Sequence, residues 1–155
     1  MEYLPLFAKV AERPILLVGG GDVALRKARL LLDAGARLTI VAPCLHEELQ
    51  ELADAAALYH LAAEFSAEQL AGQRLVIAAT DDEAVNAAVA AAAEAEGLWV
   101  NVVDDPARSS FIFPSIIDRS PIMVAVSSGG AAPVLARLLR ERLEALLPSH
   151  LGTLA

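Results

Sequence analysis

The sequence predicts an α/β protein in which a doubly wound parallel sheet is followed by a small α+β segment. As far as residue 103, short apolar runs with the length of buried strands alternate with amphipathic helical segments. This order is typical of parallel strands joined by right-handed helical crossovers. A glycine-rich turn follows the first strand, and after residue 104 the alternation gives way to two apolar strands and one leucine-striped helix.

The first part of the chain is expected to provide five strands and four helices. The expected strands are 14–18, 37–42, 58–62, 74–79 and 98–103, and the expected helices are 22–34, 46–57, 66–71 and 82–96. Gly35 and Gly97 follow two of these helices, at the position where a residue with a left-handed backbone commonly ends a helix.

The second part of the chain has a different pattern. Residues 110–117 and 122–128 are expected to form two strands joined by a turn, and residues 132–147 are expected to form a helix. We therefore expect one domain over residues 1–113 and a separate segment over residues 114–155.

Composition excludes several classes of protein. Hydrophobic residues make up 56% of the 155 residues and charged residues 21%, which excludes an intrinsically disordered chain. No stretch approaches the roughly 18–20 apolar residues of a membrane span, and the N-terminus lacks a signal-peptide layout, so we expect a cytoplasmic protein without a membrane partner. A net charge of −8 without a dominant basic face argues against nucleic acid as a partner. The single cysteine excludes an internal disulfide, and the three histidines (His46, His60 and His150) show no metal-ligand spacing, so they are interpreted as surface or packing residues.

The glycine-rich turn has the form G-x-G-x-x-A over residues 19–24. Gly19 would allow the tight turn, Gly21 would let a pyrophosphate approach the backbone, and Ala24 would let the helix pack closely on the sheet. The unpaired N–H groups at the start of the following helix would then face the phosphates. This arrangement predicts a Rossmann-type dinucleotide-binding domain; the alternative is a purely structural glycine turn.

One common feature of such sites is missing. An acidic residue usually ends the second strand and binds the ribose hydroxyls of NAD, but here the strand runs into Ala42, Pro43 and Cys44. Either backbone groups of residues 42–44 replace the acid or the cofactor preference is loose, and the sequence does not decide between NAD and NADP. Cys44 is interpreted as a small packing residue rather than a nucleophile.

Polar residues also follow the fourth and fifth strands. Thr80 could contact the cofactor, while Asp81 could do so or begin the next helix as its cap. Asn101 and Asp104 lie at the end of the fifth strand, where a carboxylate can act as a general base or bind a metal. The alternative for Asp104 is a turn residue before the Asp-Pro pair.

The loop at residues 127–130 offers two hydroxyls and backbone N–H groups that could bind carboxylates of a substrate. A loop with a helix cap is the alternative. Five arginines occur after residue 104 and could line a pocket for an anionic substrate, although a solvated helix face explains at least Arg140 and Arg142.

Together these motifs resemble the N-terminal module of siroheme synthases, which combines precorrin-2 dehydrogenase and sirohydrochlorin ferrochelatase. The resemblance is carried by LPLF (4–7), VGGGDVALRKARLLLDAGARLTIVAP (18–43), IAATDDEAVN (77–86), NVVDDP (101–106) and the segment 110–152. Residues 101–152 are the most specific part, because generic dinucleotide-binding domains have no comparable segment.

The resemblance implies siroheme biosynthesis, by NAD-dependent oxidation of precorrin-2 to sirohydrochlorin and insertion of Fe²⁺, a substrate, to give siroheme. It implies that Asp104 is the catalytic carboxylate of both steps. The expected cofactor-binding residues, from the motif and the resemblance together, are Gly19, Gly21, Asp22, Val23, Pro43, Cys44 and Thr80. The expected substrate-binding residues are Asn101, Ser127, Ser128 and Gly129.

The resemblance also implies a homodimer in which residues after about 113 cross to the partner, so that 114–155 form a dimerisation and substrate-pocket segment. In this family a helical domain normally follows, and this chain would lack it, which leaves the activity of the chain alone open. A methyltransferase domain is also not expected. The main alternative is a non-enzymatic NAD-sensing regulatory domain, which would lack the segment at 101–130. A generic dehydrogenase is less well supported, because the usual catalytic residue sets are missing.

Overall fold

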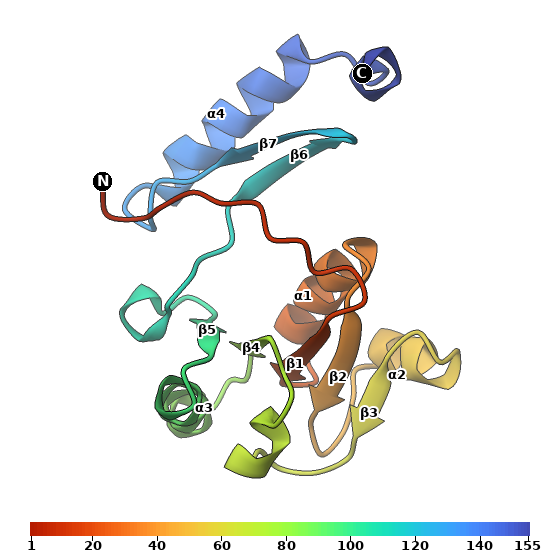
Figure 1. The fold of residues 1–155 in the computed structure, drawn as a ribbon, viewed down its shortest axis with the longest axis vertical. Helices are drawn as coiled ribbons and strands as arrows, with labels where there is room; N and C mark the ends of the chain where they lie inside the picture. Colours follow the sequence, from red (N-terminus) through yellow and green to blue (C-terminus); the bar gives the residue numbers. More distant parts are fainter. The chain divides into compact units, whose positions relative to one another are not determined.

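The computed structural model describes residues 1–155, which form two compact units (Figure 1). The larger unit comprises residues 6–111, and the smaller unit comprises residues 1–5 together with 112–155. None of the helices is both long and apolar enough to cross a lipid bilayer.

The larger unit contains a five-stranded parallel sheet with the strand order β3-β2-β1-β4-β5 (Figure 1). Its strands are β1 (Pro14–Val18), β2 (Arg37–Val41), β3 (Tyr59–Leu61), β4 (Leu75–Ala78) and β5 (Trp99–Val102). Its helices are α1 (Asp22–Asp33), α2 (Glu47–Asp54) and α3 (Glu83–Ala95), with short 3₁₀ turns η1 (Ala67–Leu70) and η2 (Pro106–Arg108). The predicted doubly wound sheet is therefore confirmed.

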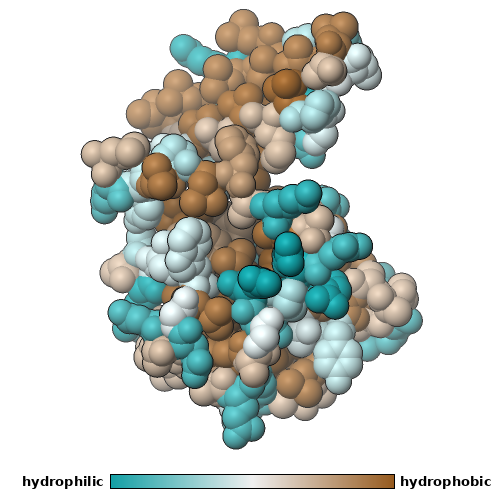
Figure 2. Space-filling view, viewed as in Figure 1, coloured by the Kyte–Doolittle hydropathy of each residue, from teal (hydrophilic) through white to brown (hydrophobic).

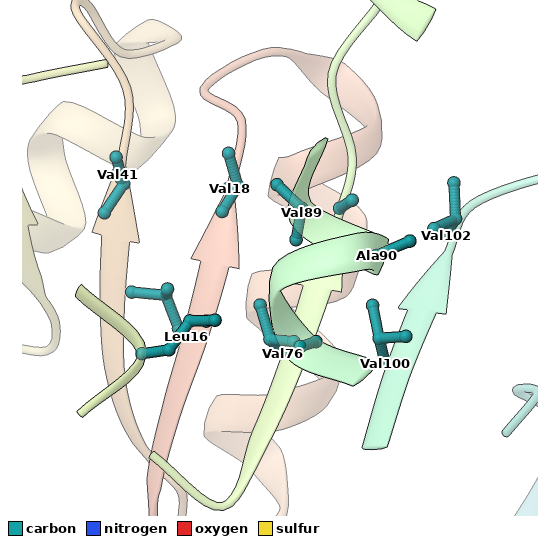
Figure 3. Packing of buried hydrophobic residues seen from close by; sticks show 11 residues of the cluster. Leu16, Val18, Val41, Val76, Val89, Ala90, Val100 and Val102 are labelled. Carbon is teal, nitrogen blue, oxygen red and sulfur yellow. The ribbon is translucent and has the colours of Figure 1, made fainter. Parts of the chain in front are cut away.

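The packing of the core explains why the sequences of the strands are continuous apolar runs. Leu16 and Val18 of β1 belong to one cluster with Val76 of β4 and Val89 of α3 (Figure 3). Ile15 and Leu17, whose side chains point to the other face of the sheet, are also fully buried, because helices cover both faces. On α1, Ala24 is completely buried, as expected of a small residue that allows close packing of the helix.

The order of the strands also locates a binding edge. From β1 the chain proceeds outward to β2 and β3, and it then returns to place β4 on the other side of β1. Loops at the carboxyl ends of β1 and β4 therefore diverge, and in such sheets ligands bind at this point of divergence. The glycine turn follows β1 at this edge.

The smaller unit contains an antiparallel hairpin of β6 (Ser115–Arg119) and β7 (Ile122–Val126), followed by α4 (Pro133–Leu146) and the 3₁₀ turn η3 (Leu151–Leu154). The expected start of the first hairpin strand at residue 110 is wrong. Ser110 instead lies beside β5, where its hydroxyl accepts a hydrogen bond from the Val100 N–H at 2.7 Å. Ser109 contacts Val102 in the same way at 2.9 Å. These residues are held by side-chain bonds along β5, so the hairpin begins only at Ser115.

Candidate dinucleotide and carboxylate site

The glycine turn brings the ends of three strands together. Gly19 has φ +131°, and a Cβ at this position would lie 2.3 Å from the carbonyl oxygen of Ala79 after β4. A Cβ at Gly20 would lie 2.2 Å from the carbonyl oxygen of Cys44 after β2. Both glycines are therefore required by close backbone approaches. The requirement for glycine at position 20 was not predicted. Gly20 occupies a variable position of the motif, and Cys44, which its backbone approaches, lies 24 residues away in sequence.

Gly21 differs from its two neighbours because it is open. Its backbone is extended (φ −97°, ψ −161°), and no atom lies within 4 Å of an added Cβ. Gly21 is also the N-cap of α1, and no side chain caps the helix there. The space beside Gly21 is therefore open at the positive end of the helix dipole, which fits the pyrophosphate of a dinucleotide. Val23 follows in this first helical turn and is half-buried.

Asp22, the first residue of α1, projects from the same turn. Its side chain is 83% exposed, and its Oδ1 lies 3.1 Å from Nε2 of His46. His46 caps α2 by accepting a hydrogen bond at Nδ1 from the Glu48 N–H at 3.2 Å. The backbone N–H of His46 donates to the Gly20 carbonyl at 2.7 Å. His46, interpreted from the sequence as a surface or packing residue, therefore belongs to the candidate cofactor site, although no sequence motif marks it.

The loop after β2 lies against the glycine turn through its backbone. Pro43 and Cys44 are both exposed, and the thiol of Cys44 is free. The interpretation of Cys44 as a packing residue is wrong, because its carbonyl group makes the close approach to Gly20 while its side chain faces outward. The expected contact of Pro43 and Cys44 with the cofactor stays a prediction.

Thr80 is tied to the start of α3. Its hydroxyl donates to Oδ1 of Asn86 at 2.6 Å, and Nδ2 of Asn86 donates to the Thr80 carbonyl at 3.0 Å. The cap of α3 is Asp82, which accepts from the Ala84 N–H at 2.9 Å, and not Asp81. The Thr80 hydroxyl is thus already engaged within the protein, and its contact with a cofactor stays a prediction.

The two adjacent aspartates after β5 have different environments. Asp105 begins η2, accepts a hydrogen bond from the Arg108 N–H, and pairs with the Arg108 guanidinium at 2.7 Å. The hydrogen bond from Arg108 lowers the pKa of Asp105. Asp104 is exposed and has φ +59°, a left-handed backbone that is unusual outside glycine. Asp104 itself lies in the turn after β5, which the Asp105 N–H closes by donating to the Val102 carbonyl at 3.0 Å, so the alternative of a turn residue is confirmed. The Asp104 carboxylate is exposed, and its function as a general base stays a prediction.

A lysine of α1 lies within electrostatic reach of Asp104. Lys27 is half-buried, and this burial lowers the pKa of its ammonium group, while the charge of Asp104 acts in the opposite direction. The carboxylate at the end of β5 and the helix that begins at the glycine turn therefore share one electrostatic environment.

Asn101 is buried rather than open to a ligand. It is 6% exposed, and its Nδ2 donates to the carbonyl of Phe111 at 3.0 Å. Its side chain thus holds the segment that returns along β5. A contact of Asn101 with substrate stays a prediction.

The other expected substrate residues belong to the smaller unit. Ser127 accepts a hydrogen bond from the Gly129 N–H at 3.1 Å, and Ser128 accepts one from the Ala132 N–H at 3.0 Å. Gly129 has φ +65°, and an added Cβ would lie 3.1 Å from the ring of Tyr3. The two hydroxyls shape the loop before α4, but the N-cap of α4 is Ala132 and no side chain caps the helix, so the loop of the alternative is present and the helix cap is not. The contact of these residues with substrate stays a prediction.

Most arginines of the C-terminal part are paired within the protein. Arg140 contacts Glu144 at 2.8 Å and Arg119 contacts the same residue at 3.8 Å. Arg137 lies 4.0 Å from Glu141. These contacts favour the interpretation of a charged helix face over a free anion pocket.

Comparison with known proteins matches residues 6–115 to a family described as putative NAD(P)-binding and residues 119–146 to one described as sirohaem biosynthesis protein central. A siroheme synthase from Tolumonas auensis is 73% identical over the whole chain, and siroheme synthase 2 from Aeromonas hydrophila is 69% identical. The chain spans 33% of the length of each of these relatives. The solved structure of SirC, a precorrin-2 dehydrogenase, matches with a TM-score of 0.82 and 25% identity over 97% of this chain and 74% of SirC. The resemblance predicted from the motifs is thereby confirmed.

Proposed function

The chain belongs to the NAD(P)-binding family that its residues 6–115 match, and from this premise we propose that it acts in siroheme biosynthesis as an NAD-dependent precorrin-2 dehydrogenase. We propose sirohydrochlorin ferrochelatase as its second activity. Both activities are those expected from the resemblance to siroheme synthases, of which this chain spans a third.

One observation carries the proposal. An open glycine, Gly21, at the uncapped start of α1 and an exposed carboxylate, Asp104, after β5 lie in the same unit, and both follow strands at the carboxyl edge of one sheet. The first group suits a dinucleotide, and the second suits proton transfer. A cofactor-binding edge that also holds a general base is what the oxidation of a C–H bond requires.

In the proposed dehydrogenation, the start of α1 binds the cofactor and Asp104 accepts a proton. When bound, NAD supplies the acceptor for the hydride that precorrin-2 loses, and the reaction forms NADH. The first N–H groups of α1, beginning at Asp22 and Val23, hold the pyrophosphate beside Gly21. Asp104 accepts the proton that the macrocycle releases, so that two electrons and two hydrogens leave the substrate in total.

The same carboxylate serves the insertion of iron. Fe²⁺ enters sirohydrochlorin as a substrate, and two pyrrole protons must leave the macrocycle. Asp104 accepts these protons, and Lys27 of α1 lies within electrostatic reach of it. The loop residues Ser127, Ser128 and Gly129 are proposed to bind the macrocycle, while the buried Asn101 is proposed to act through the segment that it holds along β5.

We propose that the protein is a homodimer formed through the smaller unit. Within that unit, α4 buries only Ala136. Six larger apolar residues of the helix are between 37% and 77% exposed: Val134, Leu135, Leu138, Leu139, Leu143 and Leu146. Figure 2 shows that the surface of this unit is mainly hydrophobic. An apolar helix face of this size commonly marks an interface.

Light scattering after size-exclusion chromatography tests this assembly. We expect a dimer for the unmodified chain, dissociation in Leu138→Glu, and no change in Arg142→Gln, a control on the same helix. A monomer at every concentration would contradict the proposal. The cytoplasm is the proposed location, which suits a chain with a free thiol.

The enzymatic proposal is tested by the formation of NADH, followed by its near-ultraviolet absorbance, after precorrin-2 and NAD are added without oxygen. Asp104→Asn is the matched variant, because asparagine tolerates the left-handed backbone while it removes the charge. We expect turnover by the unmodified chain and none by the variant, with NAD binding retained in both. Equal turnover would contradict the function of Asp104. Binding of NAD without turnover, also in a chain extended beyond Ala155, would favour the NAD-sensing alternative.

A further inference from the structure

The acid that usually binds the ribose of NAD is missing after β2, yet the structure brings a carboxylate to this place from another element. Oδ1 of Asp22, at the start of α1, lies 3.1 Å from Nε2 of His46, in the loop that follows β2. We infer that Asp22, held by His46, distinguishes NAD from NADP. The inference rests on the proposed NAD-dependent function and adds the residue that selects the cofactor and the residue that positions it.

The contacts of His46 fix the direction of its ring. Nδ1 accepts a hydrogen bond from the Glu48 N–H at 3.2 Å, so in the neutral imidazole the ring hydrogen lies on Nε2. Nε2 therefore donates to Asp22. The backbone N–H of His46 is bound to the Gly20 carbonyl at 2.7 Å, which anchors the residue to the glycine turn.

The backbone around this pair is closely packed. The Cys44 carbonyl lies so near Gly20 that a Cβ there would be 2.2 Å away. The loop after β2 and the glycine turn thus hold each other in place. Asp22 and His46 project from these two segments, so their separation is set by packed backbone.

The charge and exposure of Asp22 suit the recognition of a hydroxyl. His46 contacts one carboxylate oxygen, and the side chain is 83% exposed, so the second oxygen is accessible to a ligand. A carboxylate accepts hydrogen bonds from ribose hydroxyls and repels the additional phosphate of NADP. Arg29 on the same helix is paired with Glu48, so its charge is already neutralised within the protein.

Calorimetric titration with NAD and with NADP tests the inference on the unmodified chain and three variants. Asp22→Asn removes the charge. His46→Asn keeps a side-chain acceptor that can cap α2 but is too short to reach Asp22. Asp33→Asn removes an exposed carboxylate from the far end of α1 and serves as the control. Thermal unfolding verifies that each variant is folded.

We expect the unmodified chain to bind NAD at least about tenfold more tightly than NADP, and Asp22→Asn to reduce this ratio about tenfold. His46→Asn should reduce the ratio by about threefold, and Asp33→Asn should leave it unchanged. A ratio that neither Asp22→Asn nor His46→Asn alters, tighter binding of NADP, or binding of neither dinucleotide would overturn the inference. If the ratio changes as expected but precorrin-2 is not oxidised, the inference holds and the proposed enzymatic function fails.

Discussion

Replacement of Gly21 by alanine separates cofactor binding from folding. The position has an extended backbone that alanine adopts without strain, and no atom lies within 4 Å of the new methyl group. The methyl group nevertheless projects from the N-cap of α1, into the space that we assign to the pyrophosphate. Gly20→Ala is the contrasting variant, because its methyl group would collide with the backbone of the loop after β2.

The structure sets the size of both effects. In Gly21→Ala, alanine is a poorer N-cap than glycine but reduces the entropy of the unfolded chain, so the free energy of unfolding should change by less than about 1 kcal/mol. In Gly20→Ala, the Cys44 carbonyl must retreat from 2.2 Å to beyond 3.0 Å from the new Cβ. Strain of this kind costs about 1–3 kcal/mol, which lowers the melting temperature of a chain of this length by about 2–12 °C.

In contrast to stability, the affinity for NAD should change strongly in Gly21→Ala. Loss of one hydrogen bond to the charged pyrophosphate costs about 1.5–3 kcal/mol, so Gly21→Ala should bind NAD about 10- to 150-fold more weakly. Calorimetric titration gives the dissociation constant, and thermal unfolding gives the stability of the same sample. Unchanged NAD affinity in Gly21→Ala would refute the assignment of the pyrophosphate site. A melting temperature that falls as far as in Gly20→Ala would refute the conclusion that this position is open.

Three further predictions concern charge and packing. Asp104→Asn should lower the pKa of Lys27 further, because the charge of Asp104 in the unmodified chain opposes the effect of burial. Titration of Lys27 by NMR measures this pKa, and an unchanged midpoint would contradict the proximity of Lys27 and Asp104. Arg108→Gln should destabilise the protein at neutral pH but progressively less in acid. The reason is that the lowered pKa of Asp105 stabilises the folded state above the unfolded-state pKa, and this contribution disappears as the pH falls through the folded-state pKa; parallel stability curves with pH would argue against it. Gly152→Ala should lower the free energy of unfolding of the smaller unit by about 1–3 kcal/mol, since the new Cβ would lie 2.0 Å from the Ser120 carbonyl oxygen in the β6–β7 turn. An unaltered denaturation midpoint would disprove this contact.

The sequence was sufficient for the sheet because burial on both faces produces a visible pattern. The expected strand at 14–18 coincides with β1, and the expected helix at 82–96 contains α3. The same reasoning failed at residue 110, where an apolar run continues to residue 117 and resembles a strand. Ser109 and Ser110 bond to β5 through their hydroxyls, and an apolar pattern does not report such bonds.

The part of the site formed by one short motif could be predicted from the sequence, but the part formed where distant segments meet could not. Gly19 and Gly21 were identified from their spacing alone. The requirement for Gly20 depends on Cys44, and the contact of Asp22 depends on His46, and both partners lie more than twenty residues away in the loop after β2. A pattern read along the chain shows the first kind of constraint and misses the second.

The two adjacent aspartates show how backbone conformation separates residues that the sequence presents as equivalent. Asp105 directs its carboxylate back to the N–H and guanidinium of Arg108, which stabilises the η2 turn. Asp104 instead lies in the preceding turn, which the Asp105 N–H closes on the Val102 carbonyl at 3.0 Å, and its backbone there is left-handed, at φ +59°. Aspartate is one of the few residues other than glycine that tolerates this backbone. The position therefore favours a short polar side chain, and aspartate is the member of that set which also provides a base.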